Sequence, residues 1–199
     1  MPLNTLSVYN FRNINELSIE LAPQFNIIYG NNGTGKTSLL ESIHYLATGK
    51  SFRTHIQQRI IQDGQRAFQI RVEKQQQKQI LSLGIQKDRN GQRTIRINGE
   101  NSPSINQLAQ HLPIKIITTH SYRFFYDGPK QRRQCLDWGV FHVKPNYFSC
   151  WQHFQKILKQ RNAAIKNKCP RHEIENWNAL FCEYATELST YRLDYIEQL

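Results

Sequence analysis

The sequence has no long hydrophobic run. None of its 199 residues belongs to a stretch approaching the roughly 20 consecutive apolar residues that a membrane-spanning helix needs. The opening MPLNTLSVYNFRN also lacks the basic-then-apolar pattern of a signal peptide. We therefore expect a cytoplasmic protein without a membrane partner. Hydrophobic residues make up 39% of the chain, which suffices for the core of one large domain.

Cysteine is scarce, and none of the four cysteines forms a C-x-x-C pair. We expect reduced thiols rather than disulfides. Two Cys-x-x-His spacings, Cys150 with His153 and Cys169 with His172, raise the alternative of a zinc site. Trp151 lies beside the first pair on an apolar helical stripe, and no glycine knuckle is present, so we expect no zinc.

Acidic residues are rare in the middle of the chain. Residues 51–172 carry 22 basic and six acidic groups, a net charge of +16, whereas residues 173–199 carry one basic and six acidic groups. A positive field of this size favours polyanions, most often nucleic acid. No run of Lys and Arg is longer than two, so a merely basic surface is the alternative.

The segment 138–172 lacks acidic residues altogether and is predicted to be largely helical. Basic side chains here and just before it favour contacts with a DNA backbone, although a solvated helix face is the alternative for each of them. The predicted DNA-contacting residues are Arg132, Arg133, Lys156, Lys159 and Lys166.

The chain does contain one phosphate-binding pattern. GNNGTGKTS at residues 30–38 fits G-x-x-x-x-G-K-[ST], with an apolar run before it and a helical pattern after it. Its glycines let backbone amides turn toward a phosphate, Lys36 reaches the β- and γ-phosphates, and Thr37 offers a hydroxyl to Mg²⁺. The predicted ATP-binding residues of the loop are Gly30, Asn31, Asn32, Gly33, Thr34, Gly35, Lys36, Thr37 and Ser38.

Arg12 and Asn13 allow two interpretations. They form either a plain turn between two strands, with Arg12 solvated, or a second wall of the nucleotide site, with Arg12 turned onto the phosphates.

Alternation and turn residues predict the remaining elements. Pairs of turn residues at 63–64, 90–91 and 98–99 predict hairpins in a β meander over 56–100. The expected strands and helices of this half are strands at 3–9, 17–21, 25–29 and 115–118, and helices at 36–48 and 105–111. The strands at 25–29 and 115–118 are expected to be buried.

From Pro129 onward the pattern is helical. A helix from about residue 145 is expected to place Trp151, Phe154, Leu158 and Ile165 on one apolar stripe, and a last helix runs from about residue 173.

Four segments together resemble the RecF family: NFRN near residue 12, GNNGTGKTSLLESI near residue 30, GKSFR at 49–53 and GPKQRRQCLDWGVFH at 128–142. RecF proteins are bacterial recombination-repair ATPases related to the head domains of SMC proteins and of the ABC class. The resemblance implies an ATP-dependent homodimer that binds gapped DNA and works with RecO and RecR in replication and repair. It also implies that Arg12 contacts the nucleotide.

The chain departs from that family at several positions. Thr119-His120 stands where a Pro-acidic pair is usual, Asp127 replaces a glycine, and Cys135 replaces an aromatic residue. No predicted strand ends in a magnesium-holding carboxylate, and no ABC signature segment is visible, since in the family both lie further along. The catalytic residues, and whether this chain hydrolyses ATP, are therefore left open.

Together these features predict an α/β fold: a P-loop NTPase lobe of the ABC/SMC head type, with an inserted antiparallel β lobe and a helical arm. We expect a nucleotide-binding lobe at 1–118, with the β insert at 56–100, and a helical arm at 119–199. The predicted function is ATP-dependent DNA binding in recombinational gap repair. The alternatives are a P-loop kinase or small-molecule NTPase without a DNA role, and an interaction module that uses ATP only to fold.

Overall fold

The computed structural model describes residues 3–76, 79–119, 121–126 and 128–199, so the departures noted at His120 and Asp127 lie outside the described residues. The chain divides into two compact units, Met1–Ile116 and Ile117–Leu199. Within the described ranges, no helix is both long and apolar enough to cross a membrane.

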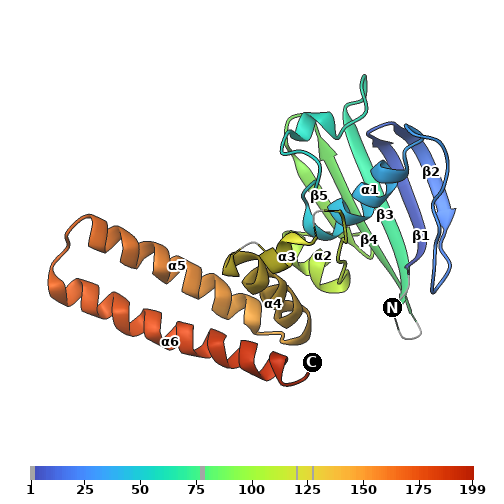
Figure 1. Cartoon of the computed structure of the whole chain (residues 1–199). Coiled ribbons are helices and arrows are strands. Elements are labelled where there is room, and N and C mark those ends of the chain that lie inside the picture. The colour runs from blue at the N-terminus through green and yellow to red at the C-terminus, as the bar shows by residue number, and fades with distance from the viewer. Residues whose placement is uncertain (1–2, 77–78, 120, 127) are drawn as a thin grey trace. The chain divides into compact units, whose positions relative to one another are not determined.

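The first unit is built on one antiparallel sheet (Figure 1). Its order is β2-β1-β3-β4-β5-β6, so each strand of the expected β insert continues the N-terminal hairpin in the same sheet. The described strands are β1 (Leu3–Phe11), β2 (Ile14–Glu20), β3 (Ala67–Gln76), β4 (Gln79–Asp88), β5 (Arg93–Ile97) and β6 (Glu100–Ser102).

Two of the three turn predictions hold as hairpins. The Asn-Gly pairs at 90–91 and 98–99 connect β4 to β5 and β5 to β6, with Gly91 at φ 90° and Gly99 at φ 86°. Glycine suits both positions because L side chains rarely adopt positive φ. The turn at 63–64 joins no pair of strands; it follows the isolated bridge between Phe11 and Ile61.

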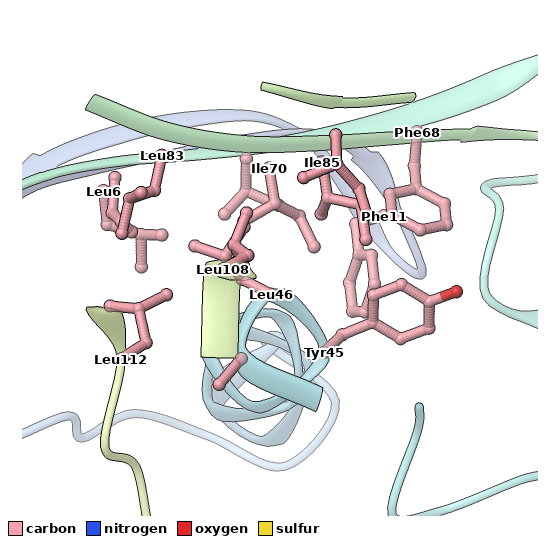
Figure 2. Close-up of a cluster of buried hydrophobic side chains, with 14 of the residues drawn as sticks. Leu6, Phe11, Tyr45, Leu46, Phe68, Ile70, Leu83, Ile85, Leu108 and Leu112 are labelled. Carbon is pink, nitrogen blue, oxygen red and sulfur yellow. The ribbon is translucent and has the colours of Figure 1, made fainter. Parts of the chain in front are cut away.

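One face of the sheet carries the core. Alternate residues of β1, β3 and β4 point to that face, as a half-buried sheet requires. Helices α1 (Lys36–Thr48) and α2 (Ile105–His111) cover it, and Figure 2 shows their side chains meeting those of the strands. The rings of Phe11, Tyr45 and Phe68 pack edge to face, at centroid distances of 5.1–6.1 Å. This packing fixes α1 on the sheet.

The two expected buried strands are absent. Residues 25–29 and 114–118 form neither helix nor strand, and Phe25, Tyr29 and Ile117 are 84%, 89% and 88% exposed. Their apolar composition favours strands, but a strand exists only when a neighbour completes its backbone hydrogen bonds. Within the described residues neither segment has such a neighbour.

The second unit is helical, with α5 and α6 forming a long antiparallel hairpin (Figure 1). Its helices are α3 (Arg123–Tyr126), α4 (Pro129–Val143), α5 (Tyr147–Lys166) and α6 (Arg171–Ile196). Pro129 begins α4 as expected. The predicted stripe of α5 is only partly right. Trp151, Phe154 and Leu158 are half-buried, and the first two pack against the core of this unit, but Ile165 is exposed. The buried residues of α5 are Tyr147, Cys150, Ile157 and Ala164.

Candidate nucleotide-binding site

The loop at residues 30–38 curls around its own lysine. Gly30, Gly33 and Gly35 have φ values of 142°, 86° and 99°, which only glycine adopts without strain. Lys36 Nζ donates to the carbonyl oxygens of Gly30 at 2.7 Å and Asn31 at 2.6 Å. Helix α1 begins at Lys36, so its free amide groups face the same loop. A concave set of N–H donors beside an ammonium group is an anion-binding arrangement.

Asn13 holds this loop against the β1–β2 turn. Its Nδ2 donates to the carbonyl oxygen of Gly33 at 2.8 Å, and its Oδ1 accepts from Ser38 Oγ at 2.8 Å. A Cβ atom at Gly35 would lie 3.4 Å from Asn13 Nδ2. One amide side chain therefore bridges the loop and the first turn of α1.

Arg12 occupies a strained turn position, with φ at 58°. Its amide donates to the carbonyl oxygen of Ile60 at 2.8 Å. Its side chain forks onto Glu41 through Nη2 at 2.7 Å and Nε at 3.1 Å. A non-glycine residue with positive φ costs roughly 1 kcal/mol and marks a position that the surroundings determine. Arg12 is thus neither a solvated turn residue nor free to swing.

The loop, the turn and the segment 53–63 enclose one hollow of about 570 Å³. Its walls combine the predicted loop residues with others that the sequence did not single out. The lining residues are Arg12, Asn13, Asn32, Gly33, Gly35, Lys36, Thr37, Ser38, Arg53, Arg59, Ile61 and Asp63. Arg53, Arg59, Ile61 and Asp63 were not predicted as site residues, although Arg53 is the last residue of the GKSFR segment at 49–53. Gly30, Asn31 and Thr34 shape the loop through hydrogen bonds within it.

Asp63 is a carboxylate that lines this hollow. Asp137 and Asp194 lie instead in helices α4 and α6 and have partners in the helical unit. Asp137 accepts from Tyr147 at 2.6 Å and from Arg192 at 2.8 Å, and Asp194 pairs with Lys144 at 3.4 Å. Both therefore tie helices of the second unit together.

The predicted DNA-contacting residues lie on the second unit. Arg132 and Arg133 are exposed on α4, and Lys156, Lys159 and Lys166 are exposed on α5. At 100° per residue, the three lysines fall within one stripe of α5.

Arg161 differs from these lysines. It donates to Asn178 at 2.6 Å and its guanidinium lies 5.3 Å from the centre of the Phe181 ring. It therefore belongs to the contact between α5 and α6.

The first Cys-x-x-His pair, Cys150 and His153, has an ordinary environment in the helical unit. Cys150 is buried, and burial together with the Glu187 carboxylate raises the pKa of its thiol to about 12. Its Sγ lies 3.9 Å from the carbonyl oxygen of Tyr184, and the His153 ring lies against the Tyr184 ring. Among the described residues, no group of three or more His, Cys, Asp or Glu is placed to hold a metal ion.

Comparison with known sequences points to one family. The RecF/RecN/SMC N terminal domain matches residues 2–134. The chain is 45% identical over 199 residues to the DNA replication and repair protein RecF of Coxiella burnetii (strain Dugway 5J108-111), and 44% identical over 200 residues to that of Pseudoalteromonas translucida (strain TAC 125). It spans about half the length of these curated relatives, 56% of the first and 55% of the second.

Solved structures agree on the fold. A structure of the recombination mediator protein RecF-ATPrS in the RecFOR pathway superposes with a TM-score of 0.85 at 26% identity, over 98% of this chain and 54% of that chain. The Smc head domain from Pyrococcus furiosus superposes with a TM-score of 0.60 at 15% identity, over 98% of this chain and 57% of that chain. The fold is thus that of an SMC/RecF-type ATPase head: an antiparallel sheet with helices.

Proposed function

Since this chain belongs to the RecF/RecN/SMC N-terminal domain family, we propose that it binds ATP and Mg²⁺ in the hollow at the phosphate loop. We further propose that it binds DNA through the basic surface of its helical unit, as part of an ATP-dependent protein of recombinational gap repair and replication. Two observations support this proposal: the relatives named above are called DNA replication and repair protein RecF, and the recombination mediator protein RecF of the RecFOR pathway has a solved structure with ATP. RecO, RecR and an ATP-dependent homodimer are the partners that this proposal implies.

The hollow carries the nucleotide part of the proposal. Lys36, Arg12, Arg53 and Arg59 bring four cationic groups to its walls. The loop amides add hydrogen-bond donors beside them. A polyphosphate is the ligand that satisfies both features, because it offers many acceptor oxygens and several negative charges.

Magnesium fits the residues present. Thr37 is exposed and lines the hollow next to Lys36, so its hydroxyl would hold the ion. Asp63 lines the same hollow and would hold the ion or one of its waters. Bound Mg²⁺ would neutralise part of the charge on the phosphate oxygens.

The DNA part separates this proposal from a P-loop kinase or small-molecule NTPase. We expect the protein to bind labelled duplex and gapped DNA with little dependence on base sequence, because exposed lysines contact phosphates rather than base edges. Affinity should fall roughly 100-fold between 50 and 200 mM salt, as a handful of phosphate contacts releases condensed counterions. Fluorescence anisotropy at several salt concentrations measures both properties.

Two triple variants locate the surface. Lys156→Gln, Lys159→Gln and Lys166→Gln together should reduce the slope of log affinity against log salt by about 2 to 3. The matched control removes the same charge from exposed positions of the first unit, by Lys50→Gln, Arg66→Gln and Arg96→Gln together. This control should change the salt slope less than the α5 variant does. Absence of salt-dependent binding would contradict the DNA function and favour the enzyme without a DNA role.

A further inference from the structure

We infer that Glu41 is a positioning residue that holds the Arg12 and Arg53 guanidinium groups in one fixed orientation at the wall of the nucleotide hollow. The inference rests on the proposed ATP function. It adds a residue that touches no ligand yet determines how two cations meet the phosphates.

Glu41 lies on α1, five residues after Lys36, and is 0% exposed. Both of its oxygens are occupied. Oε1 accepts from Arg12 Nη2 at 2.7 Å and from Ser51 Oγ at 2.5 Å. Oε2 accepts from Arg12 Nε at 3.1 Å and from Arg53 Nη1 at 3.5 Å. A buried carboxylate requires such partners, since an uncompensated buried charge costs several kcal/mol.

The fork between Arg12 and Glu41 fixes the plane of the guanidinium group. A third N–H, on Nη1, donates to the carbonyl oxygen of Arg59 at 2.7 Å. These three bonds use three of the five N–H donors of Arg12. One donor on each terminal nitrogen is left to meet a phosphate, and the Arg12 side chain is 15% exposed and lines the hollow.

Glu41 holds Arg53 less tightly than it holds Arg12, through the single contact of 3.5 Å. The Arg53 side chain is 46% exposed and lines the same hollow. Ser51 strengthens the link between Glu41 and the Arg53 segment, because its hydroxyl also accepts hydrogen bonds from the amides of Arg53 at 2.9 Å and Thr54 at 3.0 Å. Glu41 therefore connects the β1–β2 turn and the segment after α1 to the helix that begins with Lys36.

A purely electrostatic effect and a positioning effect of Glu41 predict opposite changes in ATP affinity when the carboxylate is removed. If only charge mattered, removing Glu41 would leave the hollow more positive and ATP would bind more tightly. If Glu41 orients Arg12, its removal releases the guanidinium and ATP binds less tightly. The sign of the effect therefore distinguishes a positioning role from simple electrostatics.

The test is a double-mutant cycle on Mg²⁺-ATP affinity, measured by calorimetry. Glu41→Gln and Arg12→Ala should each weaken binding roughly 10-fold. In the Arg12→Ala background, Glu41→Gln should weaken binding much less or strengthen it, because only Arg53 is then left for the carboxylate to orient and its remaining charge repels the phosphates. Equal weakening by Glu41→Gln in both backgrounds, or no effect on the wild type, would overturn the inference.

Ser42→Ala is the matched control, because it removes a buried hydroxyl from the same helix, where it donates to the carbonyl oxygen of Leu39, and leaves Glu41 and both arginines in place. It should bind within about 3-fold of wild type. A loss as large as that of Glu41→Gln would assign the effect to local packing and overturn the positioning role.

Two further variants keep the outcome decisive. If Glu41→Gln does not fold, Arg12→Lys replaces it: this variant keeps the charge but not the fork, and should lose about as much affinity as Arg12→Ala. Wild-type affinity in Arg12→Lys would overturn the inference. Lys36→Ala separates the two levels: if it binds ATP as wild type does, the proposed function fails. If Lys36→Ala binds ATP weakly but the effects of Glu41→Gln and Arg12→Ala are additive, the proposed function stands and only the positioning role fails.

Discussion

At the scale of single residues, the candidate nucleotide site depends on side chains of two kinds. The phosphate loop and Lys36 follow from a short local pattern, and the structure gives them the backbone that the pattern requires. Glu41 follows from no local pattern, because a glutamate in the second turn of a helix ordinarily faces solvent. Its burial is caused by Arg12 and Arg53, which meet it from outside its helix.

Two histidines of the first unit make stability depend on pH. Burial lowers the pKa of His44 below its ordinary 6.5, although the Glu41 charge acts in the opposite direction. Burial, helped by the Lys74 charge, lowers the pKa of His111. The unfolded chain therefore takes up these protons first as the pH falls below about 6.5. The stability that neutral His44 and His111 contribute is fully present above that pH and is lost below it.

We accordingly expect the urea midpoint of unfolding to fall between pH 7.5 and pH 5.5. His44→Gln and His111→Gln should each show a smaller fall than wild type, because glutamine does not titrate. A midpoint that rises toward pH 5.5, or variants with the wild-type pH dependence, would show that these side chains are not held neutral.

At the scale of elements, local signals predict helices and tight turns well and predict strand pairing poorly. Helix α1 has the expected bounds because both its loop and its terminal Gly49 are local signals. The segments 25–29 and 115–118 have the composition of buried strands, but their pairing depends on neighbours remote in sequence. Helix α5 was expected, yet α4 and α6 determine which of its faces is buried.

The packing of α4 against α6 gives an element-scale prediction. Gly139 is buried on α4, and a Cβ atom there would overlap the Tyr195 ring, with Cζ at 2.5 Å. We expect Gly139→Ala to lower the free energy of unfolding by about 1–3 kcal/mol, because overpacking outweighs the better helix propensity of alanine. Urea denaturation followed by circular dichroism measures the change.

The matched control is the same substitution in a Tyr195→Ala background, where the ring is gone. There Gly139→Ala should cost less or become stabilising, since only the helix propensity remains. A variant Gly139→Ala as stable as wild type would contradict the close packing of the two helices.

At the scale of the whole molecule, the basic residues that dominate the middle of the sequence are not confined to one of the two units. The helical unit carries the exposed lysine stripe of α5, but the first unit also carries exposed basic residues such as Arg66 and Arg96. Net charge therefore indicated a polyanion as the partner but did not locate the surface.

The central claim is that the hollow at the phosphate loop binds ATP through Lys36. Isothermal calorimetry with Mg²⁺-ATP on wild type and Lys36→Ala tests it most directly, with Lys50→Ala as an exposed lysine outside the hollow. Lys36→Ala should weaken binding by about 1.5–3 kcal/mol, roughly 10- to 150-fold, because it removes the ammonium group and leaves the loop amides in place. Lys50→Ala should bind as wild type does. Equal ATP affinity in wild type and Lys36→Ala would contradict the account.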